Sequence, residues 1–124
     1  MIERAIKVPN AEHPINIERN AGRVRVLAGG QVIADTRRAL TLREAGHPSV
    51  LYIPRHDVVM GALQRSNTAS YCPYKGEADH YRIREAGGGD AEVAWAYSAP
   101  YWAVSELENH IAFDPSGVDR IEVH

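Results

Sequence analysis

Two stretches near the start of the chain, residues 23–28 and 31–36, are short apolar runs interrupted by charged or polar residues. Valine, isoleucine and threonine are frequent in them, and these residues favour β-strands. Only Gly29 and Gly30 separate the two runs. A two-residue glycine turn between β-rich runs is the strongest short-range signal of a hairpin. We therefore predict a β-hairpin over residues 23–36.

Further stretches have the composition or the alternation of β-strands. Residues 49–54 form a short apolar run that ends at a proline, which is typical of a buried strand. Residues 78–84 alternate apolar and polar side chains, and a glycine-rich turn at residues 87–90 leads to another strand at 92–97. Residues 119–123 are expected to form the final strand.

Helical signals are weaker than the strand signals. Asp57 is suited to cap a short helical turn over residues 58–64, because an aspartate side chain accepts hydrogen bonds from the first-turn amides. Residues 100–110 contain apolar residues at helical spacing. Residues 39–45 fit either a strand or a helical turn, so their structure stays open at this point.

The predicted elements favour a mainly β fold of antiparallel sheets, with about six to eight short strands and one or two short helices. Tight glycine turns join the strands, whereas a parallel sheet needs crossovers of about a dozen residues. Residues 1–22, which carry prolines before any periodicity, are expected to form an extended N-terminal lead-in. Residues 23–124 are expected to form a single β domain.

Overall composition is that of an ordinary globular domain and argues against several classes of partner. The 14 Lys and Arg residues against 16 Asp and Glu give a formal net charge of −2, so the chain's field does not attract nucleic acid or an anionic membrane. The start of the chain lacks an apolar run that would suit a signal peptide or a membrane span, which favours a cytoplasmic protein. A homodimer is compatible with a small β domain that exposes strand edges.

Metal and cofactor signals are absent from the sequence pattern. The single cysteine, Cys72, excludes an internal disulfide and a cysteine-rich zinc site within one chain. The histidines are scattered, and neighbouring residues such as Asp79 and His80 point to opposite faces of a strand. We therefore predict no metal site and no cofactor.

The segment 66–76, Ser-Asn-Thr-Ala-Ser-Tyr-Cys-Pro-Tyr-Lys-Gly, gathers a thiol, an amine, hydroxyls and phenols in a predicted loop. Loops with this content often carry function. Pro73 favours an extended Cys72, and Gly76 lets the chain turn sharply next to Lys75. If the Lys75 ammonium points at Cys72, it favours a reactive thiolate. The alternative, a buried apolar Cys72 and a surface Lys75, is equally open.

The same segment carries a resemblance to a known family. Cys72-Pro-Tyr-Lys-Gly-Glu-Ala78, followed by Ala94-Trp-Ala-Tyr97, resembles the family of domains of unknown function 427 (DUF427), some members of which carry a nucleotidyltransferase-like label. The resemblance extends over about residues 23–123. It implies a small antiparallel two-sheet domain related to the β-tent, or Mss4-like, folds, in which the sheets meet at an angle over a ligand-sized opening.

Two features associated with such relatives are missing from this sequence. Many β-tent domains hold a structural zinc ion with two Cys-x-x-Cys pairs, and this chain has neither pair. The nucleotidyltransferase label also lacks support, because the chain has no Gly-Ser with paired aspartates for magnesium and no phosphate-binding glycine loop. The resemblance therefore implies the fold and its opening, with closure by apolar or hydrogen-bonded contacts in place of zinc.

On that architecture, the candidate binding residues converge on an aromatic-lined pocket. Trp95 and Tyr97 share one face of a strand and are expected to wall the pocket, with Tyr74 and Gly76 in the loop at its lip. A plain core stripe is the alternative interpretation of the two strand aromatics, since buried aromatics are common in cores.

Polar candidates would orient the ligand. Arg55 or Lys75 suits an anionic group, and Asp57 or Thr68 is suited to orient a hydroxyl or an amine. Each of the last two has a simpler alternative, a helix cap for Asp57 and a turn residue for Thr68.

These observations predict a domain that binds a small-molecule ligand, and two classes of function stay open. As an enzyme, it would use Cys72 as nucleophile or redox thiol, Lys75 as its electrostatic activator, and Asp57 or Tyr97 as proton carrier. As a non-catalytic recognition module, it would bind a ligand or a partner peptide in the same pocket. A third interpretation is a structural domain whose motif fixes a difficult turn.

Overall fold

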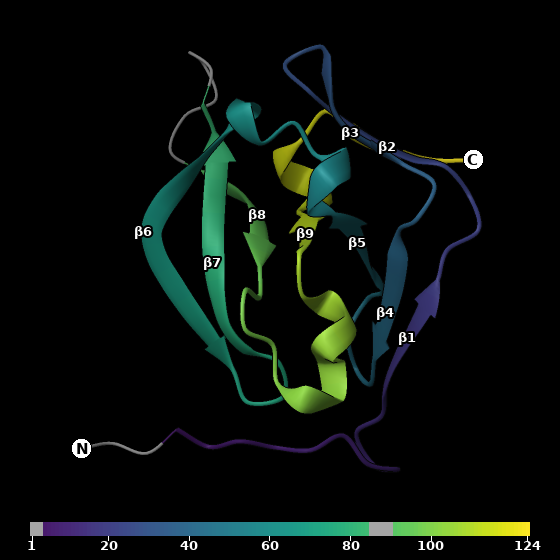
Figure 1. Cartoon of the computed structure of the whole chain (residues 1–124), viewed down its shortest axis with the longest axis vertical. Helices are drawn as coiled ribbons and strands as arrows, with labels where there is room; N and C mark the ends of the chain where they lie inside the picture. Colours follow the sequence, from purple (N-terminus) through teal and green to yellow (C-terminus); the bar gives the residue numbers. More distant parts are fainter. Residues whose placement is uncertain (1–3, 85–90) are drawn as a thin grey trace.

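The computed structural model of the chain describes residues 4–84 and 91–124. Its backbone forms two antiparallel β-sheets, with short 3-10 helices in some of the connections between strands (Figure 1). The larger sheet has seven strands in the order β1-β4-β5-β9-β8-β7-β6, and the smaller sheet has three in the order β10-β2-β3. The predicted fold class, a small mainly β domain of two antiparallel sheets, is confirmed.

Most strands are short, and the two longest form a hairpin at one edge of the larger sheet. The larger sheet contains β1 (Ile15–Arg19), β4 (Leu40–Glu44), β5 (Val50–Pro54), β9 (His110–Phe113), β8 (Glu92–Ala96), β7 (Gly76–Ile83) and β6 (Leu63–Cys72). The smaller sheet contains β10 (Arg120–Val123), β2 (Val24–Ala28) and β3 (Gln31–Thr36).

Short 3-10 helices lie between strands at four places in the described part of the chain. They are η1 (Arg55–Asp57), η2 (Met60–Ala62), η3 (Trp102–Leu107) and η4 (Pro115–Gly117). The longest, η3, has six residues and is interrupted by non-helical dihedral angles at Val104. Across residues 4–84 and 91–124, no helix has the length and apolar content needed to cross a membrane.

Local sequence patterns locate several strands correctly. The hairpin predicted over residues 23–36 is the β2–β3 pair, and Gly29 and Gly30 turn it with φ values of 59° and 75°. Left-handed values at both turn positions match the twist of the flanking strands, which is why glycine is favoured there. The strands expected at 49–54 and 92–97 are β5 and β8. The predicted turn at 87–90 lies outside the described residues.

The predicted helices are wrong in type or length. Asp57 does not cap a helix over 58–64: it is the last residue of η1, and its carboxylate accepts a hydrogen bond from the Thr36 hydroxyl at 2.7 Å. Strand β6 already begins at Leu63, paired with Ile83. Pairing along a long strand outweighs a weak local helical tendency that already includes a glycine.

The segment 66–76 is not a free loop between elements. Residues up to Cys72 belong to β6, and the chain turns only at residues 73–75 before β7 begins at Gly76. The prediction failed because β6 is an edge strand whose exposed middle carries polar side chains on both faces. The segment expected as an extended N-terminal lead-in contains β1, which pairs with β4 through Ile17 and Leu42.

Two clusters of buried side chains lie on opposite faces of the larger sheet. One cluster packs against the smaller sheet and includes Val24, Val26, Ile53, Ile111 and Phe113. The other packs under η3 and includes Leu42, Tyr52, Tyr97, Val104 and Leu107.

Strand β8 distributes its side chains between these two clusters. Trp95 packs with the cluster under η3, whereas Val93 belongs to the opposite cluster. In a regular strand these two residues would share a face, but the β7–β8 register shifts between Tyr81 and Arg82, so Val93 occupies a bulge. Trp95 and Tyr97 therefore belong to the cluster under η3, without Val93.

Candidate functional site

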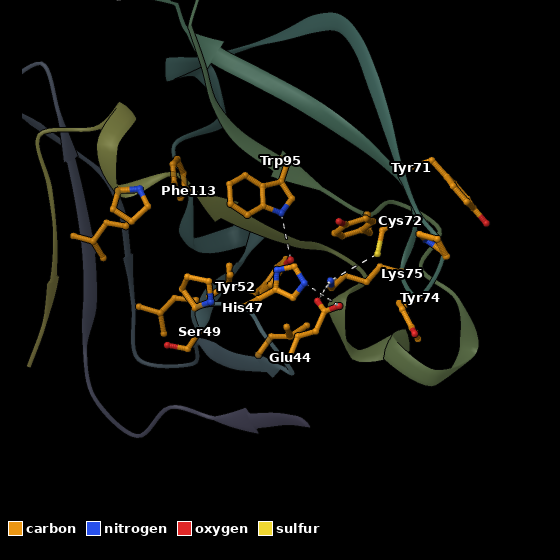
Figure 2. Close-up of a pocket in the computed structure, with 18 of the residues that line it drawn as sticks. Glu44, His47, Ser49, Tyr52, Tyr71, Cys72, Tyr74, Lys75, Trp95 and Phe113 are labelled. Carbon is orange, nitrogen blue, oxygen red and sulfur yellow. Dashed lines mark hydrogen bonds and ion pairs between the residues drawn. The ribbon is translucent and has the colours of Figure 1, made fainter. Parts of the chain in front are cut away.

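A cavity of about 1060 Å³ opens beside the cluster under η3 and continues toward β10. Residues of β4, β5, β8 and the β6–β7 turn line it, so it collects side chains from distant parts of the chain. This volume is at the upper end of the range for small-molecule sites. In Figure 2, Cys72 and Lys75 lie at one end, Phe113 lies at the other, and Trp95 and Tyr52 lie between them.

A buried ion pair marks one end of the cavity. The Lys75 ammonium donates to Glu44 Oε1 at 2.5 Å, and the two side chains are only 10% and 8% exposed. Glu44 ends β4 and shares the inward face with Leu42, because side chains two positions apart on a strand point the same way. Lys75 belongs to the β6–β7 turn, so the sheet topology brings the two residues together across 31 positions of sequence.

Two histidines surround the second oxygen of the same carboxylate. His13 Nε2 lies 2.8 Å from Glu44 Oε2, and His47 Nε2 lies 3.9 Å from it. The His13 ring also stacks on Tyr74, with ring centroids 4.2 Å apart and an interplanar angle of 12°. Burial alone would raise the pKa of Glu44, but the hydrogen bonds from Lys75 and His13 outweigh it and lower that pKa. Glu44 is therefore an anion at neutral pH.

Acidification is expected to remove the stability that the Glu44 carboxylate provides. A carboxyl whose pKa is lowered on folding stabilises the fold above its ordinary value of 4.5, and this stabilisation is lost as the pH falls through the folded value. The free energy of unfolding of Glu44→Gln should therefore depend less steeply on pH below 4.5 than that of the unmodified protein. Urea denaturation at a series of pH values measures both slopes, with Glu18→Gln as an exposed-carboxylate control; equal slopes for Glu44→Gln and the unmodified protein would contradict the prediction.

The β6–β7 turn places the thiol next to the buried amine. Lys75 Nζ lies 3.8 Å from Cys72 Sγ, and the Lys75 amide donates to the Cys72 carbonyl at 3.2 Å. Gly76 then leaves the turn with φ at 108°, a value that side-chain-bearing residues rarely adopt. A Cβ at Gly76 would lie 3.4 Å from the Ala99 carbonyl oxygen, an ordinary contact, so the dihedral angle is what requires glycine. Glycine at this position thus permits the turn that brings Lys75 inward.

Aromatic side chains line the middle of the cavity. The indole of Trp95 donates to the Tyr52 hydroxyl at 3.3 Å (Figure 2). Tyr52 is only 2% exposed, and burial raises its pKa to about 12. Tyr97 also lines the cavity, and burial raises its pKa too. Both phenols are therefore neutral hydrogen-bonding groups at neutral pH.

The structure brings together most of the residues that the sequence singled out. Cys72, Tyr74, Lys75, Trp95 and Tyr97 all line the cavity. Gly76 is not among its lining residues and acts on the backbone next to it.

Arg55 and Asp57 lie elsewhere. They follow β5 at the end opposite the β4–β5 turn, so the strand carries them away from Glu44. Arg55 Nη1 lies 3.5 Å from the Tyr81 hydroxyl, and Asp57 accepts the hydrogen bond from Thr36.

Thr68 is also outside the cavity. It is an exposed residue in the middle of β6, where the β6–β7 register shifts between Arg65 and Ala69. Its amide donates to the Ser66 hydroxyl at 3.2 Å, which is a local contact within the irregular part of the strand.

The sequence interpretation missed the polar residues that surround Lys75 and its carboxylate partner: Glu44, His13 and His47. One signal for Glu44 was present, because Leu40, Leu42 and Glu44 alternate and so predict an inward carboxylate if residues 39–45 form a strand. The two histidines gave no such signal, because His13 stands between Glu12 and Pro14, His47 stands between Gly46 and Pro48, and neither belongs to an alternating pattern. Over residues 4–84 and 91–124, no group of three or more His, Cys, Asp or Glu side chains is arranged to hold a metal ion.

Comparison with known proteins assigns the chain to a family. No curated protein matches it significantly. The sequence model of the family described as a domain of unknown function, DUF427, matches residues 16–124. The match spans nearly all of β1 and every later strand, including Glu44 and the β6–β7 turn. The chain therefore belongs to the DUF427 family.

Proposed function

We propose that the protein binds a small molecule in this cavity. The flat apolar part of the ligand lies beside Trp95, and its polar part contacts the Glu44–Lys75 pair. The observation that carries the proposal is a buried ion pair placed at the end of a large aromatic-lined cavity. Ligand sites typically combine apolar walls with a few fixed polar groups in this way.

The ion pair is better explained by binding than by stability. Removing two charges from water is costly, and a buried pair is often no more stabilising than apolar residues of similar size. Both Glu44 and Lys75 line the cavity, so they present an acceptor and a donor to its contents. Because the two groups are held in fixed positions, they orient a bound ligand.

The charges of the site indicate which ligands it favours. The formal charges of Glu44 and Lys75 cancel, and Arg120, which lines the cavity near β10, forms an ion pair with Glu122 at 2.7 Å, so neither a strong cation nor a strong anion has a dedicated counter-charge. An ammonium has three N–H groups, of which two are directed at Glu44 and Cys72, which leaves one for a ligand acceptor. We therefore expect a neutral or zwitterionic ligand with a ring and hydrogen-bonding groups of both kinds.

A thermal-shift screen tests the proposal. Nucleosides, amino acids, sugars and small aromatic amides cover neutral and zwitterionic ligands, and a compound at about one hundred times its dissociation constant adds roughly 2.7 kcal/mol of stability. We expect at least one class to raise the melting temperature of the unmodified protein. The shift should shrink in Trp95→Phe and persist in Trp102→Phe, because Trp102 is 87% exposed and outside the cavity. No shift for any class, or equal shifts in both variants, would contradict the proposal.

A second candidate function is covalent catalysis by Cys72, and the 3.8 Å separation of Lys75 Nζ from Cys72 Sγ favours it. A neighbouring ammonium stabilises a thiolate, which is the nucleophilic form of cysteine. If Cys72 acts on the ligand, mass spectrometry should detect a changed ligand or a protein adduct with the unmodified protein and neither with Cys72→Ser. If the ligand stays intact and both proteins bind it equally, the protein recognises the ligand without catalysing a reaction.

A further inference from the structure

The N-terminal segment before β1 runs along the edge of the domain, below the β6–β7 turn and η3, and we call residues 4–14 the strap (Figure 1). Its first part is attached at several points to the end of the β6–β7 hairpin. The Lys7 amide donates to the Pro73 carbonyl at 2.9 Å, and the Tyr71 hydroxyl donates to the Ala5 carbonyl at 2.7 Å. The strap is thus held on the hairpin by its backbone.

Side chains add to this attachment. Arg4 forms an ion pair with Glu77 at 2.8 Å, and its guanidinium lies over the Tyr71 ring at 4.6 Å from the centroid. Lys7 Nζ lies 6.0 Å from the centroid of the Tyr74 ring. These contacts are exposed and individually weak, so the strap is attached by many small interactions that open more easily than a packed core.

The last part of the strap enters the cavity. His13 lines the cavity, contacts Glu44 at 2.8 Å and stacks on Tyr74, so it joins the strap to both sides of the polar end. The Asn10 side chain accepts a hydrogen bond from the His13 amide at 2.9 Å, which fixes the turn that delivers the ring. Of the side chains that interact with the Glu44 carboxylate in the described part of the chain, His13 is the one that lies before residue 16, where the match to the family begins.

We propose that the strap closes the Cys72–Lys75 end of the cavity and that His13 is the residue that fastens it, so strap opening controls access to the thiol and to the ligand site. When the strap opens, Tyr74 loses its stacking partner and one oxygen of Glu44 loses its nearest hydrogen-bond partner. Both changes expose the polar end of the cavity. As far as ligand access is concerned, this inference rests on the proposed function.

The single cysteine of the chain makes strap opening measurable without a ligand. Cys72 is labelled in the full chain with a small reagent, iodoacetamide, and with a bulky maleimide, and the ratio of the two rates is compared between variants. The ratio cancels changes in the intrinsic reactivity of the thiol, so it reports access. We expect His13→Ala to raise the bulky-to-small ratio by about ten-fold, the factor that corresponds to roughly 1.4 kcal/mol.

His47→Ala is the matched control. His47 is also a histidine beside Glu44, but it comes from the β4–β5 turn and not from the strap. Its ring also lies beside that of His13, with centroids 6.4 Å apart, but its removal leaves the Glu44 and Tyr74 contacts of His13 in place, so the ratio should change by less than about two-fold. Equal increases in His13→Ala and His47→Ala would overturn the role of the strap.

A conservative variant at the other attachment keeps the proposal testable if His13→Ala folds poorly. Tyr71→Phe removes the hydroxyl that donates to Ala5 and keeps the ring under Arg4, so it should raise the labelling ratio in the same direction by a smaller factor. The same hydroxyl also contacts the Tyr101 hydroxyl at 2.7 Å, so Tyr101→Phe, which removes that contact and keeps the bond to Ala5, is its control and should leave the ratio unchanged. Unchanged ratios in both His13→Ala and Tyr71→Phe would overturn the proposal. If the ligand screen fails while the labelling ratios change as expected, the proposed function is wrong and the role of the strap in covering Cys72 is supported.

Discussion

Replacing Lys75 with methionine is expected to lower the free energy of unfolding by about 3 kcal/mol, because it leaves Glu44 buried without its cation. The two side chains are 10% and 8% exposed, so water replaces the lost partner only through the cavity. His13 remains beside Glu44, which places the effect at the lower end of the range for broken buried pairs. Urea denaturation followed by circular dichroism measures the loss.

Two further variants separate burial from the mere loss of a charge. Arg43 lies on the same strand as Glu44 and pairs with Glu18 at 3.2 Å, but both partners are more than half exposed. Arg43→Met should therefore lower stability by at most about 1 kcal/mol. The double variant Glu44→Gln/Lys75→Met should recover more than half of the loss, since no buried charge is left unpaired. Similar losses in Lys75→Met and Arg43→Met would show that the pair behaves as a surface pair.

Leu107→Ala is expected to destabilise the protein by about 3 kcal/mol, although it lies in a short 3-10 helix. Leu107 is fully buried in the cluster under η3, together with Tyr52 and Tyr97. Deleting its side chain removes apolar contacts and leaves a void, because a 3-10 helix joined to β9 has little freedom to collapse onto the sheet. Thermal and urea denaturation both report the change.

Trp102 in the same helix provides the control. It is the larger side chain, yet it is 87% exposed, so Trp102→Ala should change the free energy of unfolding by no more than about 0.5 kcal/mol. A loss in Trp102→Ala that equals the loss in Leu107→Ala would show that η3 stabilises the fold through its outer face, against the packing described above.

Local chemistry made part of this fold predictable from the sequence. The β2–β3 hairpin follows from Gly29 and Gly30, because a two-residue turn with left-handed dihedral angles admits few other residues. Strand β5 follows from its apolar run and closing proline. In both cases the interactions that decide the structure lie within a few residues of each other in sequence.

The parts that failed depend on pairing between elements, which the residue pattern of a single segment does not show. Strand β6 is polar throughout its exposed middle and is held by its pairing with β7, so its own residues resemble a loop. The sequence pattern located Cys72 and Lys75, but Glu44 reaches them only through the order of strands in the larger sheet. Asp57 was misassigned for the same reason, since its hydrogen-bond partner Thr36 comes from another sheet.

The attachment of the strap also sets an order of events during folding. Arg4 and Glu77 are 73 positions apart in sequence, and Ala5 and Tyr71 are 66 apart, whereas the β6–β7 hairpin closes over three residues. Contacts between distant positions form late, because closing a long loop loses chain entropy before any contact compensates for it. The hairpin must also exist before the strap has a surface to bind. The strap therefore binds only after the β6–β7 hairpin has formed, and until then Cys72 has no strap beside it.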